Sequence, residues 1–423
     1  MLYYRRVLIV AILLLFFLKI AVIFFYQDQI GMWEDDVIAR NMLETGEMFY
    51  MQRGTPNYMF QFPVYPWLLF VTYKIFGYDP FYAIVLNIVI ISITCFLLYK
   101  IFIDICTIQD LKLKRVKPEL IALLSVLAFL LHPFISYYSM FKVHPFIINM
   151  FFPVLIILLS IKYIQRPSIK NLCLLGISTG FGILNRSTAF VALLPFVFFE
   201  IEHFGFKKFI LNLLVVFSIS LLVISPWLMR GYSLYGKASM APMLSEVLWK
   251  GSLYNSDGSN YLLDGRTYKS VLSKKEKEYL YGQPIVVQND FFSAKYNNLL
   301  RIDPQHVLHM YLLKIKNFWL YHKNIGIEYG KKIQSLLFIY KGYSVFLLIL
   351  NFCAFFIFKF KPLVLLSYPI GLSLIQSIFY VETRHRMIAE PIIFFFGVLV
   401  LIYIYDIIII YNSRLGEKKV FPL

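Results

Sequence analysis

The fold is decided by the stretch VLIVAILLLFFLKIAVIFFYQDQIGMWEDD, residues 7–36. Its first part, residues 7–25, is almost entirely apolar and has the length of a helix that crosses a bilayer, about 20 residues. Three consecutive acids follow, Glu34, Asp35 and Asp36. Apolar runs of similar length recur along the chain. Because a segment in lipid must satisfy its own backbone hydrogen bonds, the pattern predicts an all-α multi-pass membrane protein.

The composition agrees with a membrane protein. The 423 residues are 59% hydrophobic and 15% charged, with a mean hydropathy of +0.68. Soluble domains are about 45–50% apolar and about 25% charged. The first apolar run is too long for the core of a signal peptide and has no small-residue cleavage site, so we expect an uncleaved first helix.

The net charge of +17 has a topological meaning. In a soluble protein it would suggest nucleic acid. Here the basic residues sit in short loops between apolar runs, which is the pattern of cytoplasmic loops. We therefore expect no nucleic-acid partner. The four cysteines, Cys95, Cys106, Cys173 and Cys353, lie in apolar runs or in loops on that side, and no two have the spacing of zinc ligands.

The basic clusters predict about ten spans with both termini cytoplasmic, in the cell (inner) membrane. The clusters are Arg5–Arg6, Lys112–Lys117, Lys162–Lys170, Lys207–Lys208, Lys359–Lys361 and Arg414–Lys419. The predicted spans are 6–26, 81–103, 119–134, 145–162, 171–185, 187–201, 209–229, 335–358, 362–380 and 388–411.

Four outer regions remain, approximately 27–80, 132–144, 231–334 and 381–386. The first contains PVYPWLLFVTYKIFG, residues 63–77, which is too short to span and predicts a re-entrant or interfacial helix. We divide the chain into a transmembrane catalytic module (1–230), a small extracytoplasmic segment (231–334) and C-terminal transmembrane helices (335–423).

The three acids have different expected roles. Asp36 lies four residues before Arg40, the spacing of a helical ion pair, and acids favour a helix N-terminus. Glu34 and Asp35 have no cation four residues later. An unpaired carboxylate at the edge of the membrane is suited to accept a proton from a hydroxyl, so these two are candidate general bases.

Several arginines lie at the predicted outer ends of spans, against the usual charge bias. Arg384 and Arg386, in VETRHRMIAEP (381–391), either extend toward lipid phosphates or form a cationic clamp for a bound phosphate. Arg230 and Arg186 occupy similar positions. Glu390 is expected to pair with Arg386, four residues earlier.

Several stretches together resemble one family. They are WEDDVIARNMLETGEMFY (33–50), FQFPVYPWLLFVTYKIFGYDP (60–80), GILNRSTAF (182–190), SPWLMRGYSLYGK (225–237) and ETRHRMIAEP (382–391). In this order they resemble the GT-C membrane glycosyltransferases, the bacterial relatives of protein O-mannosyltransferases (family 39) and of the transferase that adds aminoarabinose to lipid A. The resemblance covers most of the chain except 240–330.

The resemblance implies an enzyme that transfers a sugar, with inversion, from a polyprenyl-phosphate donor to an acceptor hydroxyl on the extracytoplasmic side. A first-loop acid would be the base, with Glu34 preferred over Asp35, although relatives usually carry an aspartate here. Arg384 and Arg386, with Arg230 nearby, would hold the donor phosphate. Tyr58 is a candidate to stack on sugar or prenyl. The resemblance favours no required metal, with a divalent cation as the alternative.

Two other classes of membrane protein fit the same sequence features. A transporter or flippase of lipid-linked sugars would share the spans and the arginines. A non-catalytic subunit of an envelope-assembly complex would share them too. For an enzyme, the acceptor is an envelope glycan, a lipid or a protein.

Overall fold

The computed structural model describes residues 2–108, 116–320, 337–358 and 363–418, with only the backbone for 337–340 and 410–418. Several predicted features lie outside these residues: Lys112, Lys114 and Arg115 of one basic loop, Lys359, Lys361 and Lys419, and the predicted boundary at 334. The described structure is helical, with only short two-stranded pairings beside the helices.

Apolar helices of different lengths form a bundle, and most of the expected spans coincide with one helix each. They are α1 (Leu2–Phe25), α4 (Pro80–Ile108), α5 (Pro118–Leu130), α7 (Phe146–Gln165), α8 (Ile169–Asn185), α9 (Leu194–Phe204), α10 (Phe206–Tyr235), α16 (Leu337–Ile357), α18 (Ser367–Gln376) and α20 (Glu390–Lys418). In the described residues, five helical stretches are long and apolar enough to cross a membrane, or six with one bent pair. The predicted count of ten is not shown.

The bent pair corrects one prediction. Residues 132–144, expected to be a loop, contain the helix α6 (Pro133–Phe141), which is bent by 57° from α5. Pro133 has no N–H and fits the first position of a helix, so a new helix begins there. The side chain of His132 accepts a hydrogen bond from the Ile135 N–H and so caps the N-terminus of α6. The expected span 187–201 also differs, because it begins as a 3-10 helix, η2 (Ser187–Leu193), before α9.

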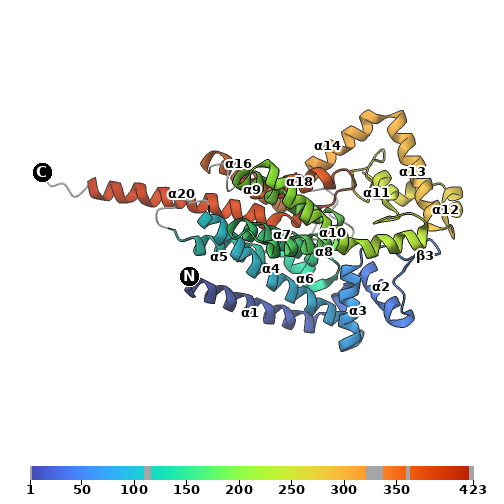
Figure 1. Ribbon diagram of the computed structural model, residues 1–423, viewed down its shortest axis with the longest axis horizontal. Coiled ribbons are helices and arrows are strands. Elements are labelled where there is room, and N and C mark those ends of the chain that lie inside the picture. Colours follow the sequence, from blue (N-terminus) through green and yellow to red (C-terminus); the bar gives the residue numbers. More distant parts are fainter. Residues whose placement is uncertain (1, 109–115, 321–336, 359–362, 419–423) are drawn as a thin grey trace.

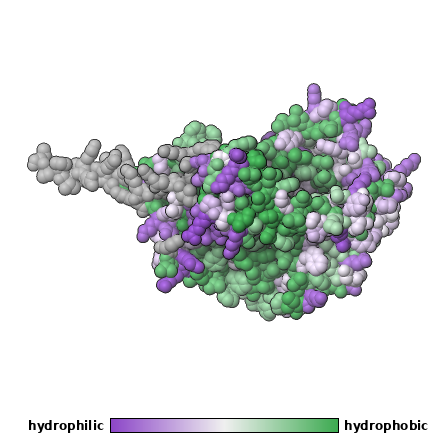
Figure 2. Space-filling model, in the orientation of Figure 1, coloured by the Kyte–Doolittle hydropathy of each residue, from purple (hydrophilic) through white to green (hydrophobic). Residues whose placement is uncertain are grey.

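The bundle is elongated, and Figure 1 shows its two ends. The start of α1 and the end of α20 lie at one end, and the outer segment lies at the other. Figure 2 shows a broad hydrophobic region over the bundle, with hydrophilic residues gathered toward the two ends. Large apolar side chains of the bundle helices, such as Leu14, Phe17, Phe217 and Leu222, are exposed. Such a surface is stable in contact with lipid.

The first outer loop folds against the end of the bundle. It contains α2 (Glu34–Thr45), a hairpin of β2 (Tyr50–Gln52) and β3 (Thr55–Asn57), and α3 (Val64–Phe76). The predicted short helix at 63–77 is therefore present, and α2 ends at Gly46 as its sequence indicates. A parallel pairing of β1 (Gly31–Met32) with β4 (Lys142–Val143) joins the loop to the residues before α7.

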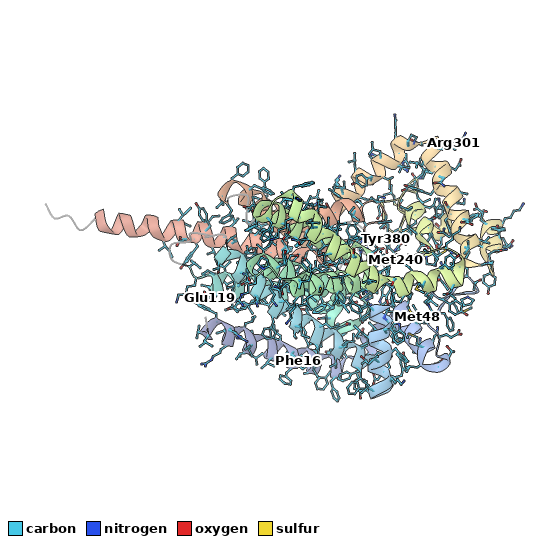
Figure 3. All side chains as sticks on the ribbon, viewed as in Figure 1. Phe16, Met48, Glu119, Met240, Arg301 and Tyr380 are labelled. Carbon is cyan, nitrogen blue, oxygen red and sulfur yellow. The ribbon has the colours of Figure 1, made fainter. Side chains whose placement is uncertain are left out.

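The outer segment contains α11 (Leu244–Lys250), α12 (Lys274–Leu280), α13 (Ile285–Ile302) and α14 (Pro304–Leu320). It has a small core of its own, formed by Trp249, Leu253, Leu262, Leu272, Leu280 and Phe292. The short helix α19 (Thr383–Met387) leads into α20. In Figure 3, Met48, Met240 and Tyr380 lie near the junction between bundle and outer segment, whereas Glu119 lies toward the other end of the bundle.

Candidate active site

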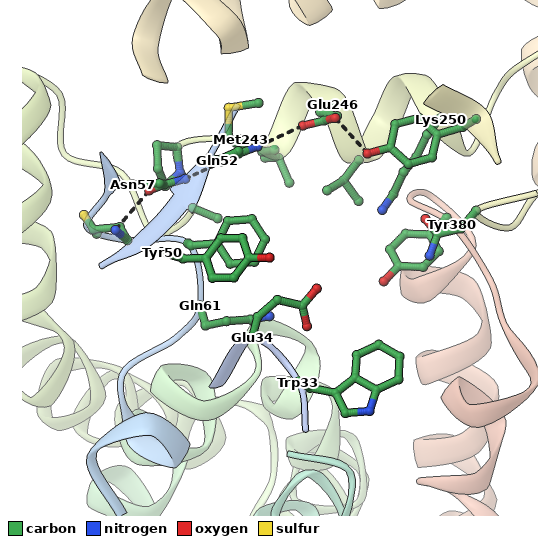
Figure 4. A pocket seen from close by; sticks show the side chains of 18 of the residues that line it. Trp33, Glu34, Tyr50, Gln52, Asn57, Gln61, Met243, Glu246, Lys250 and Tyr380 are labelled. Carbon is green, nitrogen blue, oxygen red and sulfur yellow. Dashed lines mark hydrogen bonds between the residues drawn. The ribbon is translucent and has the colours of Figure 1, made fainter. Parts of the chain in front are cut away.

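A pocket of about 620 Å³ lies between the first outer loop, the start of α7, the outer segment and the α18–α19 connection. Figure 4 shows part of its lining. Both halves of the chain contribute, from Trp33 to His385. The pocket therefore exists only when the outer segment is folded onto the bundle.

Glu34 lies at the floor of this pocket. It is the first residue of α2, after Trp33 in extended conformation, and its carboxylate points into the space in Figure 4. Within the described structure Glu34 has no hydrogen bond or ion pair. Successive helical residues point about 100° apart, so the next two acids face elsewhere.

Asp36 and Asp35 are buried behind Glu34, and neither lines the pocket. Asp36 accepts hydrogen bonds from the hydroxyls of Tyr73 (2.6 Å) and Tyr78 (3.1 Å), and it pairs with Arg40 at 3.3 Å, as the helical spacing predicts. The Oδ2 atom of Asp35 has no hydrogen-bond partner among the described residues. Burial, and then the neighbouring Glu34 carboxylate, raise the pKa of Asp35 well above its usual value.

The β2–β3 hairpin forms one side of the pocket. Its two-residue turn, Arg53–Gly54, has both φ angles in the left-handed region, 50° and 78°, as a type I′ turn requires. Gln52 accepts a hydrogen bond from Asn57 at 2.8 Å, and Tyr50 stacks on Phe60 with ring centroids 4.4 Å apart. Amide and aromatic groups thus face the cavity on this side, a combination suited to a sugar.

The opposite side is basic. We call Arg186, Lys250 and Arg384 the basic side of the pocket. Lys250 Nζ lies 3.9 Å from the ring centroid of Tyr380, and Arg186 donates to Gln376 at 2.7 Å. Arg384 pairs with Glu382 at 2.7 Å.

Two histidines lie beside the basic side, His144 and His385, and both line the pocket. Burial lowers the pKa of each well below its usual value. The cations lower it further, Arg384 first for His144 and Arg186 first for His385. Both histidines are therefore neutral near pH 7.

A second cavity, which we call the groove, has a volume of about 580 Å³. Its lining is largely apolar and includes Trp67, Leu184, Val223, Pro226 and Trp227, and Arg230 is its one cation among the described residues. Arg230 Nη2 donates to the Met48 carbonyl at 3.4 Å, and its Nε has no partner in the described structure.

Residues 48–60 lie between the groove and the pocket, and we call this stretch the partition. Met48 and Tyr58 line the groove, whereas Tyr50, Asn57 and Met59 line the pocket. The two cavities thus lie on either side of this stretch.

The structure separates the residues that the sequence put forward. Glu34, Arg186 and Arg384 line the pocket, and Arg230 and Tyr58 line the groove. Asp35, Asp36 and Arg386 line neither. Arg386 is 0% exposed, donates to the Trp319 carbonyl, and lies 3.8 Å from Glu390, so the expected pair is present.

The sequence alone did not point to Arg53, Glu246, Lys250 or Tyr380. Glu246 and Lys250 lie in the outer segment, in SEVLWKGS (245–252), which carries no recognisable motif. No local signal distinguishes Lys250 from the other lysines of that segment.

Two comparisons bear on this arrangement. Residues 60–229 match the family described as dolichyl-phosphate-mannose-protein mannosyltransferase. A second match, of fold, is to the crystal structure of ArnT from Cupriavidus metallidurans bound to undecaprenyl phosphate, with a TM-score of 0.50 and 13% identity. It covers 94% of this chain but 59% of that one, so this chain spans about three-fifths of that protein's length. No curated protein matches the chain.

The resemblance that the sequence motifs indicated is therefore confirmed, by family over residues 60–229 and by fold over nearly the whole chain. The family region begins after Glu34 and ends just before Arg230. Both residues, and the outer segment, lie outside it.

Proposed function

We propose that this protein is an inverting glycosyltransferase of the cell membrane. It moves a sugar from a polyprenyl-phosphate donor to an acceptor hydroxyl on the extracytoplasmic side. The family match, the fold and the two cavities support this proposal. The acceptor is an envelope glycan, a lipid or a protein.

The donor fits the groove. A polyprenyl phosphate has a long apolar chain and one anionic headgroup, and the groove combines apolar side chains with the cation Arg230. A guanidinium matches phosphate oxygens with its planar fork, and the Nε of Arg230 is still without a partner. Trp67, half exposed, and Tyr58 would contact the first prenyl units.

Glu34 is the residue that carries the proposal. Within the described residues, the carboxylates that line the pocket are Glu34 and Glu246. Glu246 is committed to Arg53, and it accepts a hydrogen bond from the Tyr268 hydroxyl at 2.9 Å. Glu34 alone is unengaged, and a general base must be free to accept a proton.

The reaction then needs a single displacement. The acceptor hydroxyl gives its proton to Glu34, and its oxygen forms a bond to the anomeric carbon. The bond from that carbon to the phosphate oxygen breaks, and polyprenyl phosphate leaves with the electron pair. Attack from the face opposite the leaving group inverts the configuration, and Arg230 stabilises the charge that develops on the phosphate.

The test is release of free polyprenyl phosphate by purified protein in detergent, with extracted polyprenyl-phosphate sugars and an envelope fraction as acceptor. We expect release by the wild type, a loss of at least about 100-fold in Glu34→Gln, and near-normal release in Asp35→Asn. If Glu34→Gln still releases polyprenyl phosphate at the wild-type rate, then Glu34 is not the general base. No release, from lipid extracts that a known transferase accepts, would favour the transporter or subunit alternatives.

A further inference from the structure

The basic side of the pocket carries more positive charge than the proposed donor requires. The charged residues that line the pocket are Arg53, Arg186, Lys250, Lys269, Arg384, Glu34 and Glu246. Cations thus outnumber acids in the lining by five to two. Lys250 lies on the side opposite the hairpin, across the cavity from Glu34 (Figure 4).

The individual pairings locate this excess. Arg53 is paired with Glu246 and Arg384 with Glu382. Arg186 has only neutral partners, Gln376 and Thr188, and Lys250 lies over the rings of Tyr380 and Tyr268. Among the described residues, neither Arg186 nor Lys250 has a carboxylate partner. In the part of the chain that the structure describes, these two cations of the lining therefore form no ion pair.

The buried His385 links the members of the basic side. After burial, the charges of Arg186, Arg384 and Lys250, in that order, lower the pKa of His385. A neutral histidine does not add to the positive charge, and the three cations lie close enough to it to act on the same side chain. That place has a positive potential, which favours a bound anion.

The position of Lys250 is fixed by the backbone. It ends α11, and the next residue, Gly251, packs so closely on the α18–α19 connection that a Cβ there would lie 2.0 Å from the Phe379 carbonyl oxygen. This backbone contact holds the Lys250 side chain beside Tyr380. The ammonium group of Lys250 lies over the ring of Tyr380. The position of Lys250 on the basic side therefore depends on the packing of the outer segment against the α18–α19 connection.

We propose that the acceptor carries an anionic group, a phosphate or a carboxylate, close to its attacking hydroxyl, and that Arg186 and Lys250 bind this group. The inference rests on the proposed function, because it assigns the donor phosphate to Arg230 on the other side of the partition. An anion at the basic side would hold the acceptor across the cavity from Glu34. Arg186 offers a planar fork and Lys250 a compact charge, a pairing suited to either oxyanion.

The test measures binding without turnover. Purified protein in detergent is titrated with glucose 6-phosphate, glucuronate and glucose at constant ionic strength, and the shift in Tm gives apparent affinities. We expect one or both anionic probes to bind at least about tenfold more tightly than glucose. Lys250→Gln and Arg186→Gln should each remove most of this preference, and Lys250→Arg should retain it.

The matched control is Lys274→Gln, which removes the same charge from the outer segment at a side chain that is 91% exposed. It should leave the preference for the anionic probes unchanged. A preference for neither anion in the wild type, or an equal loss in Lys274→Gln, would overturn the proposal.

Undecaprenyl phosphate, titrated in parallel, separates the two sources of an anion. We expect its affinity to fall in Arg230→Gln and to be nearly unchanged in Lys250→Gln. If Lys250→Gln weakens the binding of undecaprenyl phosphate instead of the binding of the sugar probes, then the basic side holds the donor. That result overturns the proposal about the acceptor but not the proposed glycosyltransferase function. Absence of polyprenyl phosphate release would contradict the glycosyltransferase and would leave the probe affinities as a separate result.

Discussion

The guanidinium of Arg53 pairs with the carboxylate of Glu246 across 193 positions of the chain. Arg53 sits at the turn of the first-loop hairpin, and Glu246 sits on the first helix of the outer segment. The Arg53 side chain is 18% exposed and that of Glu246 is 7% exposed. Gln288 and Tyr268 add hydrogen bonds of 2.9 Å each. This network closes the pocket over Glu34.

Arg53→Gln should therefore loosen the outer segment from the bundle. Loss of one partner of a mostly buried ion pair leaves the other charge uncompensated, at a cost of about 3 kcal/mol or more. We expect chymotrypsin, whose cleavage sites neither this substitution nor its control changes, to cleave within residues 231–320 faster than in the wild type. The control is Arg266→Gln, whose pair with Asp264 is exposed. Equal cleavage rates for the two variants would show that the pair does not hold the segment.

The helices were predictable because their signal is local. A run of about 20 apolar residues needs no partner to be recognised, and the bundle helices follow those runs. Residues 132–144 were missed as a helix because a short, bent helix has no length signal, although Pro133 marked its start.

The site was predictable only in part, because side-chain direction depends on packing. Arg384 and Arg386 are two residues apart in one short helix, so they point in widely different directions. One lines the pocket and the other is buried against Trp319. Lys250 reaches the same pocket as Glu34 only through the docking of the outer segment, and no spacing in the sequence encodes that approach.

Arg230→Gln should specifically weaken the binding of the donor. A charge-assisted hydrogen bond to phosphate contributes about 1.5–3 kcal/mol, so we expect the KM for the polyprenyl-phosphate sugar to rise about 10- to 100-fold. Lys237→Gln is the matched control, because it removes a charge just after the same helix at a side chain that is 68% exposed. Steady-state kinetics with varied donor measures the change. An unchanged KM in Arg230→Gln would place the donor phosphate elsewhere.

Asp35 should make the protein less stable as the pH rises. Its pKa is raised in the folded protein, so the unfolded chain loses the proton first. Stability is then full below the unfolded pKa and decreases as the pH rises from there through the folded pKa. Asp35→Asn removes this loss, and we expect its Tm at pH 8 to exceed that of the wild type by roughly 1–3 °C.

Tm measured across pH 4–8 checks this expectation for Asp35. The two proteins should converge at low pH, where Asp35 is protonated in both the folded and the unfolded state. A constant difference at every pH would show that packing, and not the proton, is responsible.

Chelation should not abolish activity. A divalent ion would need several oxygen ligands together. Asp36 is occupied by Arg40, Tyr73 and Tyr78, and Asp35 is buried away from the pocket. We expect release of polyprenyl phosphate to persist in excess EDTA at close to its untreated rate. A loss that Mg²⁺ or Mn²⁺ restores would assign Glu34 to a metal site instead of to proton transfer.

Gly251→Ala should disturb the basic side without touching a charge. The added methyl group would meet the backbone of Phe379, which cannot move as a flexible side chain can, so α11 must shift from Tyr380. We expect weaker binding of the anionic sugar probe, by about tenfold, with undecaprenyl phosphate affinity retained. The control is Gly342→Ala, where a Cβ would meet nothing within 4 Å. If Gly251→Ala binds the probe as tightly as the wild type, then Lys250 reaches its ligand by side-chain flexibility and the backbone contact does not position it.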